Sequence, residues 1–115
     1  FGRSERLRQI ADQAMAGDVV LCISATEAGA GSDMLGIRST AVAEAGGFRV
    51  RGHKKMASPS SVADYIVLAL RGSEESRQGR DDLALFLVPT SQLRVGKTFD
   101  TVGARSISTA PVAFD

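Results

Sequence analysis

The feature of this sequence that most restricts its fold is a change of hydrophobic period at Asp18. Before that residue, apolar side chains recur at helical spacing, and Gly17 is a natural helix end. After it, the apolar residues gather in short runs rich in β-branched residues and separated by turn residues. The helical stripe consists of Leu7, Ile10, Ala11, Ala14 and Met15. The strand-like runs are VVLCIS, STAVA, FRVRGHK, DYIVLAL, LALFLV, LRVGKTF and PVAFD.

This order predicts a helix over residues 5–16, followed by a mainly β fold. Seven short strands favour an antiparallel barrel or sandwich, closed or nearly closed from about Val19 onward, because closure removes exposed strand edges. The Gly46-Gly47 pair suits a tight hairpin between two of the strands. The segment GSEESRQGRDD is too polar for a core and is predicted to be a solvated loop.

Composition limits the classes of function. A chain of 115 residues with 43% apolar content fits one domain with a sizeable core. Its 14 basic and 13 acidic residues nearly cancel, which argues against a nucleic-acid partner or a membrane-surface patch. No apolar run is long enough to cross a bilayer. The single cysteine, Cys22, lies in an apolar run and is interpreted as a buried hydrophobe of a reduced, intracellular protein.

Several common chemistries have no support in the sequence. One histidine and one cysteine provide no metal-ligand spacing, so no metal site is predicted. Neither a P-loop nor a Gly-x-Gly-x-x-Gly pattern occurs. No Gly-x-Ser-x-Gly elbow supports a catalytic triad around His53, which is predicted to be an exposed or edge-strand residue.

The stretch TEAGAGSD, residues 26–33, has the composition of a ligand-binding loop. Its glycines allow successive backbone N–H groups to converge on a phosphate or a ring oxygen. The hydroxyls of Thr26 and Ser32 can serve a heteroaromatic edge or a pyrophosphate. Glu27 and Asp33 do not suit phosphate and are expected to satisfy loop amides or basic side chains. The alternative is that the stretch forms only a turn.

TEAGAGSD is similar to the Thr-Glu-Pro-x-Ala-Gly-Ser-Asp motif of acyl-CoA dehydrogenases, with a single internal departure. The rest of the chain follows the order of that family's middle domain. The resemblance covers nearly the whole chain, and it identifies residues 18–115 as the flavin-binding β-barrel and residues 1–17 as the end of a preceding helical domain. The further matching features are Gly36, the Thr40-Ala41 strand, the Gly-Gly hairpin, Gly52, Lys54, VADYIVLAL, LALFLVP and Gly103-x-Arg105.

The resemblance implies that the barrel binds FAD. By motif position, the backbone of Ala25 and the backbone and hydroxyl of Thr26 would face the pyrimidine edge of the flavin. Gly31 and Ser32 would lie near the pyrophosphate, and Ser32 would also border the path of the acyl-CoA substrate. The family further implies N- and C-terminal helical domains in the same chain and a homo-oligomer, a dimer or tetramer, whose neighbouring subunit completes the cofactor site.

A second family triplet, usually Trp, then Ile or Phe, then Thr or Ser, packs on the flavin ring and reaches its N5 edge. Here the triplet is Met56-Ala57-Ser58, so the hydroxyl is kept and the aromatic ring is lost. Methionine is polarizable and can lie against a ring, although the alternative is that Met56 belongs to the core. Pro59 and Ile107 also depart from the residues common in the family.

The resemblance implies an FAD-dependent oxidoreductase that dehydrogenates an acyl-CoA thioester between its α and β carbons. A base removes the α proton while the β hydride passes to the flavin. The base is usually a glutamate of the C-terminal helical domain, so it is expected beyond Asp115, and this stretch alone is expected to be inactive. The expected compartment is the cytoplasm, or the mitochondrial matrix in a eukaryote.

Two alternatives to dehydrogenation remain. MAS and FDTVGAR are similar to the Phe-Ala-Ser and Trp-Asp-Thr-x-Gly-x-Arg patterns of flavin-dependent monooxygenases with the same fold. In such enzymes, the barrel shields an oxygen adduct from water. The other alternative, from a different class, is a flavin-free binding or scaffold barrel.

Overall fold

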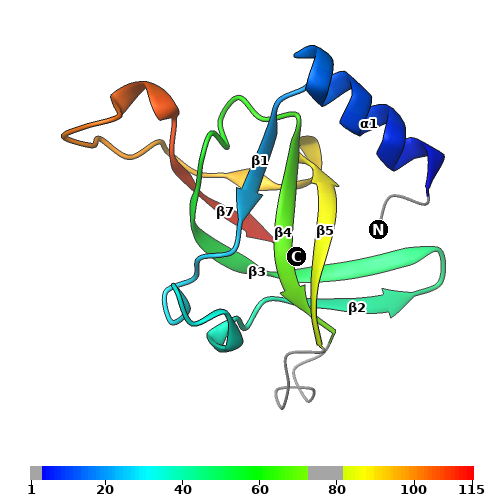
Figure 1. Ribbon diagram of the computed structural model, residues 1–115. Helices are drawn as coiled ribbons and strands as arrows, with labels where there is room; N and C mark the ends of the chain where they lie inside the picture. Colours follow the sequence, from blue (N-terminus) through cyan, green and yellow to red (C-terminus); the bar gives the residue numbers. More distant parts are fainter. Residues whose placement is uncertain (1–3, 73–81) are drawn as a thin grey trace.

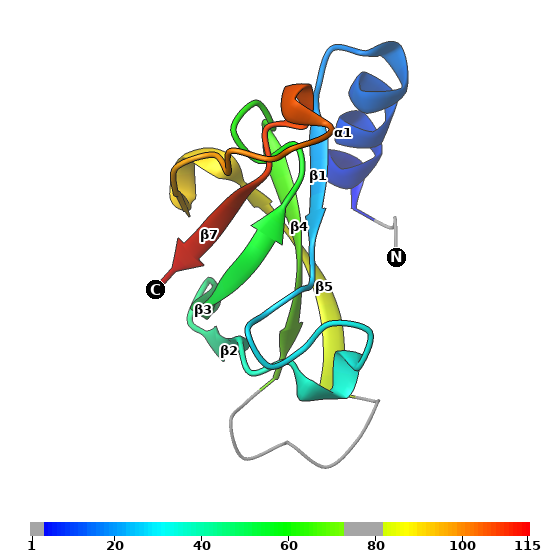
Figure 2. The same ribbon diagram turned by 90° about the vertical axis from the view of Figure 1, so that its left-hand side faces the viewer.

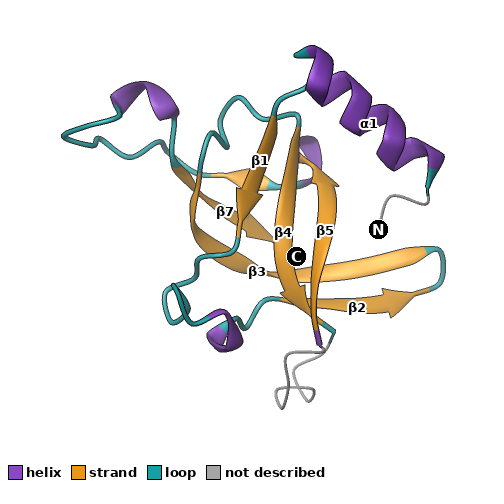
Figure 3. Ribbon diagram, in the orientation of Figure 1, coloured by secondary structure: helices purple, strands orange, loops and turns teal. Residues whose placement is uncertain are grey.

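The change of period at Asp18 is reproduced in the computed structural model, which describes residues 4–72 and 82–115 (Figures 1 and 3). One helix precedes a seven-stranded sheet, so the mainly β fold class is confirmed. Within the described residues, 3-10 turns in the connections include η1 (Met34–Gly36), η3 (Thr90–Gln92) and η4 (Arg105–Ile107). The main elements are α1 (Glu5–Ala16), β1 (Leu21–Ser24), β2 (Thr40–Glu44), β3 (Gly47–Ala57), β4 (Tyr65–Arg71), β5 (Leu83–Pro89), β6 (Arg94–Val95) and β7 (Ala110–Phe114).

The helix α1 has the bounds expected from its sequence. The Ser4 side chain accepts the Leu7 N–H at its start, and Gly17 ends it in the left-handed region at φ 84°. Figure 2 shows α1 on the outer side of the sheet, next to β1. Its apolar stripe is only partly covered, because Ile10 is buried whereas Met15 is 89% exposed. An apolar pocket of about 400 Å³ separates helix and sheet, lined by Leu7, Ile10, Ala11, Leu21, Val67, Leu85 and Leu87.

The sheet follows the order β1-β4-β2-β3-β7-β6, and β5 pairs with the other edge of β4. Antiparallel ladders join β2 to β3, β3 to β7, β4 to β5 and β6 to β7. The predicted hairpin joins β2 and β3, with Gly46 at φ 88° in the turn. Gly47 already pairs with Glu44, so the turn itself is Ala45-Gly46.

One part of the antiparallel expectation is wrong. β1 runs parallel to β4 over four residue pairs, and β2 meets β4 in a single parallel pair, Thr40 with Arg71. The direction follows from the path of the β2–β3 hairpin, which lies between β1 and β4 in the sequence. The strand β4 is buried on both sides: Ile66, Leu68 and Leu70 face the core while Ala69 is buried on the other side. A strand covered on both faces is typical of parallel pairing, and it reads as a continuous apolar run.

The sheet curls around one main core without closing completely. Figure 2 shows β3 and β7 facing β4 and β5 across the interior. Within the described residues, β6 pairs only with β7, so the far edge of β6 has no strand partner. The core cluster consists of Cys22, Ala41, Ala57, Ala63, Ile66, Leu68, Leu70, Val112 and Phe114.

The segment LRVGKTF forms a shorter strand than predicted. Only Arg94 and Val95 belong to β6, and the chain leaves the sheet after Gly96, whose N–H donates to the Pro111 carbonyl at 2.8 Å. Pro111 stands opposite Gly96 on β7 and has no N–H to return, so the ladder ends there. The predicted solvated loop GSEESRQGRDD lies outside the described residues except at Gly72 and Asp82, so that prediction stays open.

Other expectations about single residues are confirmed. Cys22 is a free, buried thiol, 2% exposed, and burial raises its pKa. His53 is exposed on β3. No helix in residues 4–72 or 82–115 is long and apolar enough to span a membrane.

Gly52 generates a stability prediction, because β3 approaches the start of β2 closely there. Its φ is 152°, and an added Cβ would lie 2.0 Å from the Ser39 hydroxyl oxygen. We expect Gly52→Ala to lower the free energy of unfolding by about 1–3 kcal/mol. Gly47→Ala is the matched control on the same strand, since its Cβ would meet no atom within 4 Å, and it should change stability by about 0.5 kcal/mol or less. Equal effects in denaturation experiments would contradict the close approach.

Candidate functional site

The stretch TEAGAGSD lies in the long loop of residues 25–39, between β1 and β2. Glu27 and Ala30 exchange backbone hydrogen bonds at 2.8 and 3.3 Å, which closes a tight turn. The Asp33 carboxylate accepts the Leu35 N–H at 3.1 Å and caps η1. The expectation that Asp33 satisfies a loop amide is therefore confirmed.

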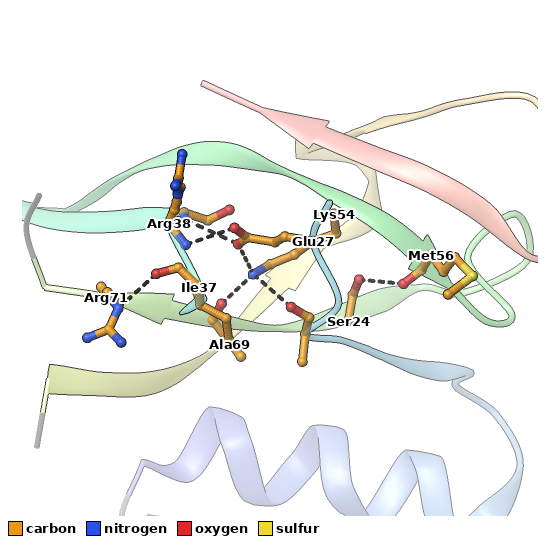
Figure 4. A network of polar contacts seen from close by, with 10 residues as sticks. Ser24, Glu27, Ile37, Arg38, Lys54, Met56, Ala69 and Arg71 are labelled. Atoms are coloured by element: carbon orange, nitrogen blue, oxygen red, sulfur yellow. Dashed lines mark hydrogen bonds and ion pairs between the residues drawn. The ribbon is translucent and has the colours of Figure 1, made fainter. Parts of the chain in front are cut away.

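Glu27 anchors the other end of the same loop. Its carboxylate accepts the N–H groups of Arg38 at 2.8 Å and Ser39 at 3.1 Å. The same carboxylate pairs with the Lys54 ammonium at 2.6 Å (Figure 4). Glu27 thus satisfies both loop amides and a basic side chain, as expected from its sequence context.

Lys54 is the cation at the centre of this network. It points inward from β3 with none of its side chain exposed. Its ammonium donates to the Glu27 carboxylate, to the Ala69 carbonyl at 2.6 Å and to the Ala25 carbonyl at 3.4 Å. All three donors of the ammonium are therefore used, and the charge is compensated inside the fold.

Burial and pairing act in opposite directions on the two pKa values. Burial raises the pKa of Glu27. The hydrogen bonds that its carboxylate accepts from Lys54, Ser39 and the Arg38 N–H lower the pKa, as does the positive charge of Lys54, and the net result is a pKa below the usual value. Burial lowers the pKa of Lys54, and the bond and charge of Glu27 oppose that shift. We interpret the pair as ionised at neutral pH, because the carboxylate receives three donors.

A second buried cation, Arg71 at the end of β4, holds the far end of the loop. Its side chain is 3% exposed, and its guanidinium donates to the Ile37 carbonyl at 2.8 Å and to the Leu35 carbonyl. Asp82 lies 3.8 Å from the same guanidinium. The loop is therefore fixed at both ends by charged groups from β3 and β4 (Figure 4).

The structure brings the two sets of predicted flavin residues side by side. The Lys55 N–H donates to the Thr26 carbonyl at 2.8 Å, and the Ser24 hydroxyl donates to the Met56 carbonyl at 3.0 Å. An isolated β-bridge also joins Ile23 to Ser58. Ala25 and Thr26 thus follow directly from a strand that contacts the segment carrying Met56, Ala57 and Ser58.

The predicted flavin residues differ in which of their atoms are free to contact a ligand. The Thr26 hydroxyl has no protein hydrogen-bond partner among the described residues, and Thr26 is half-buried. Met56 is 45% exposed, so it is not a core residue. Ala57 lies in the core at 2% exposed, which leaves only its backbone for a ligand. The Ser58 hydroxyl is 2.6 Å from the Thr109 hydroxyl, and only one of the two protons is used between them.

Gly31 and Ser32 complete the predicted set on the exposed part of the loop. No atom lies within 4 Å of a Cβ placed on Gly31, so its backbone is open to a ligand. A free hydroxyl, an open glycine backbone and an exposed thioether fit a flat heteroaromatic group that has polar atoms along one edge. No cluster of three potential metal ligands occurs in the parts of the chain that the structure describes.

Sequence reasoning did not give Lys54, Arg71 or Thr109 a role. Lys54 had a detectable signal, because it occupies an inward position of an alternating strand, where a charge needs a buried partner. Arg71 directly follows the apolar run DYIVLAL, and that position also indicates that its side chain is buried. Nothing in the sequence pairs Thr109 with Ser58, which is 51 residues away.

Comparison with known proteins shows similarity to one family, at the level of both the family model and individual relatives. The family model described as "Acyl-CoA dehydrogenase, middle domain" matches residues 22–115. The chain is 41% identical over 116 residues to acyl-(acyl-carrier-protein) dehydrogenase MbtN of Mycolicibacterium paratuberculosis. That match covers 100% of this chain and 30% of the relative.

Solved structures with the same fold are also similar. An acyl-CoA dehydrogenase from Geobacillus kaustophilus has a TM-score of 0.91 and 26% identity, covering 100% of this chain and 31% of its own. A structure described as an FAD-dependent dehydrogenase has a TM-score of 0.88 and 29% identity, covering 97% of this chain and 30% of its own. The chain thus spans about 30% of the length of these proteins.

The buried pair generates a prediction about stability. Lys54→Met leaves the Glu27 carboxylate, 9% exposed, without its counter-charge, so the free energy of unfolding should fall by about 3–5 kcal/mol. The double variant Lys54→Met with Glu27→Gln removes both charges and should be more stable than Lys54→Met alone. Urea denaturation of the two single variants and the double variant measures the coupling. Additive losses would show that the pair is not coupled.

The same pair predicts a pH dependence. The Glu27 pKa is lower in the folded state, so its contribution is fully present above the unfolded value of about 4.3 and is lost as pH falls through the folded value. The stability difference between wild type and Glu27→Gln should therefore be largest near neutral pH and shrink below about pH 4.3. Glu44→Gln, which removes an exposed pair with Arg49, should differ from wild type by about 0–1 kcal/mol at neutral pH. A Glu27→Gln difference that grows on acidification would refute the assignment.

Proposed function

The chain belongs to the acyl-CoA dehydrogenase family, as its middle domain, and from this premise we propose that it binds FAD in an enzyme that dehydrogenates an acyl thioester. The observation that carries the proposal is the juxtaposition of Ala25 and Thr26 with Met56 and Ser58. The half-buried Thr26, whose hydroxyl has no protein partner among the described residues, is thus next to the segment that carries the exposed thioether of Met56. Relatives such as MbtN, a benzylmalonyl-CoA dehydrogenase and a long-chain acyl-CoA dehydrogenase are named dehydrogenases, which favours this reaction over oxygen insertion.

Each predicted residue has a part in this proposal. Thr26 offers its hydroxyl to the pyrimidine edge of the flavin, with the Ala25 backbone beside it. Gly31 and Ser32 offer loop backbone and a hydroxyl to the pyrophosphate. Met56 lies against the ring, where it replaces the area of an aromatic side chain only in part. Ser58 lies toward the reacting edge, and whichever hydroxyl of the Ser58–Thr109 pair accepts within the pair keeps its own proton for a ligand.

When bound, FAD supplies the acceptor for the hydride that leaves the β carbon of the thioester. The chain's own contribution is to hold donors at fixed positions before the reaction begins, so that little reorganisation is needed. Lys54 and Arg71 serve this purpose, because they fix both ends of the loop that carries Thr26. The base that removes the α proton is proposed to lie outside residues 1–115.

The substrate is proposed to be an acyl thioester, with CoA as the carrier. An acyl-carrier-protein thioester is a second candidate, since the relative with 41% identity is named for that substrate. Anaerobic titration of the full-length protein with acyl-CoA and with the matching acyl-carrier-protein thioester tests both. Bleaching of the absorbance band of the oxidised flavin by either thioester supports the proposal. An intact flavin band with a panel of both thioesters would refute it.

The arrangement of the whole protein is also a proposal. We place residues 1–17 at the end of an N-terminal helical domain and residues 18–115 in the barrel, with a C-terminal helical domain and a homo-oligomer, a dimer or tetramer, completing the site. The uncovered face of α1, including Met15 at 89% exposed, supports a helical neighbour. The reduced, buried thiol of Cys22 supports a cytoplasmic location, or the mitochondrial matrix in a eukaryote.

Thr26 generates a prediction about redox potential. A hydroxyl that donates to the pyrimidine edge stabilises the negative charge that gathers there on reduction, by about 1.5–3 kcal/mol for a charge-assisted bond. Thr26→Val should therefore lower the flavin midpoint potential while leaving the melting temperature of the flavin-free protein nearly unchanged. Redox titration and thermal denaturation of the full-length protein measure the two effects.

Ser24→Ala is the matched control. The Ser24 hydroxyl is 1% exposed and donates to the Met56 carbonyl, so its loss should lower stability with little effect on the potential. The reverse pattern, with an unaltered potential and lost stability in Thr26→Val, would mean that the loop serves only as a turn.

A further inference from the structure

A pocket of about 570 Å³ lies beside the proposed flavin site without sharing its residues. It opens between the turn at Glu27–Gly29, the segment Arg38–Thr40 and the β3 residues Arg51–His53. None of the seven predicted cofactor residues lines it. Its size is that of a pocket for a small molecule.

The pocket carries unbalanced positive charge. Arg38 and Arg51 line it, and neither guanidinium has an ion-pair or hydrogen-bond partner among the described residues. His53 adds a ring that can donate to an anion. Other surface arginines differ in this respect, because the side chains of Arg49, Arg94 and Arg105 each pair with a carboxylate.

The carboxylates near the pocket do not neutralise these arginines. Among the described residues, Glu27 is the one acidic residue in the lining, and its charge is already matched by Lys54 at 2.6 Å. Asp115 is hydrogen-bonded to Arg94, and Arg51 adds only a weaker, longer-range attraction to it. The described lining therefore keeps about two net positive charges at neutral pH.

The backbone supports the same chemistry. Ala28 and Gly29 line the pocket at the centre of the tight turn, whose hydrogen bonds use only the backbone groups of Glu27 and Ala30. Within residues 4–72 and 82–115, the N–H groups of Ala28 and Gly29 donate to no backbone acceptor, so solvent or a ligand can accept from them. Gly52 lets β3 approach Ser39 at the pocket wall, where any Cβ would clash at 2.0 Å.

We propose that this pocket binds a phosphate-bearing ligand through Arg38 and Arg51. Two guanidinium groups offer the planar, paired donors that match phosphate oxygens, and arginine keeps its charge at every physiological pH. The pocket is larger than a bare phosphate, so the ligand also has a neutral part that contacts the Ala28-Gly29 turn. The phosphate has two possible sources, namely a free phosphate compound or the 3′-phosphate of CoA.

Calorimetric titration of the full-length protein with inorganic phosphate, at constant ionic strength, tests the site. Arg38→Gln and Arg51→Gln should each weaken phosphate binding about tenfold or more, and the double variant should abolish saturable binding. Arg105→Gln is the matched control, an exposed arginine paired with Asp100 away from the pocket, and it should bind phosphate as the wild type does. Unchanged melting temperatures in all variants show that folding is intact.

The source of the phosphate is resolved by titrating CoA and 3′-dephospho-CoA. Tighter binding of CoA, with the difference lost in Arg38→Gln and Arg51→Gln, assigns the pocket to the 3′-phosphate. Equal binding of the two assigns it to a separate phosphate compound, provided that inorganic phosphate binds and the arginine variants weaken it. The proposal is overturned if wild-type protein binds none of the three saturably, or if the arginine variants bind them all as wild type does.

Discussion

The buried ion pair between Lys54 and Glu27 is the interaction on which the rest of the site depends. A fully buried ammonium is costly, and here its three donors all reach oxygen atoms, one from the carboxylate and two from the carbonyls of Ala25 and Ala69. These acceptors belong to the loop after β1 and to β4. The Lys54 charge therefore joins its own strand, β3, to the loop after β1 and to β4.

This arrangement explains how a small, glycine-containing loop keeps a defined shape. Glycines at positions 29 and 31 lower the preference for any one conformation. The loop is held instead by contacts at its two ends, Lys54 and Glu27 at one and Arg71 at the other. Its middle, at Gly31 and Ser32, is exposed. The turn at Glu27–Gly29 lines the pocket of Arg38 and Arg51, whereas Thr26, directly before the turn, is bonded to Lys55 next to Met56.

The sequence was sufficient for the elements that depend on local patterning. The helix of residues 5–16, the seven strands, the hairpin and the roles of Glu27 and Asp33 follow from periodicity and turn chemistry. The parallel pairing of β1 with β4 did not follow, because strand direction depends on the path of the intervening hairpin. The short extent of β6 depends on Pro111, a residue of another strand. The partners of Lys54 and Arg71 could be identified only from the fold, since they lie 11 to 36 residues away in the sequence.

A crystal structure of the full-length protein with bound FAD would show whether the Lys54–Glu27 pair positions the flavin-binding loop. We expect the Thr26 hydroxyl within hydrogen-bonding distance of the pyrimidine edge of the flavin, Met56 against its ring, and the Lys54 ammonium still paired with Glu27 beneath the loop. A flavin bound elsewhere, or a loop whose position near the flavin does not involve the Lys54–Glu27 pair, would contradict this expectation.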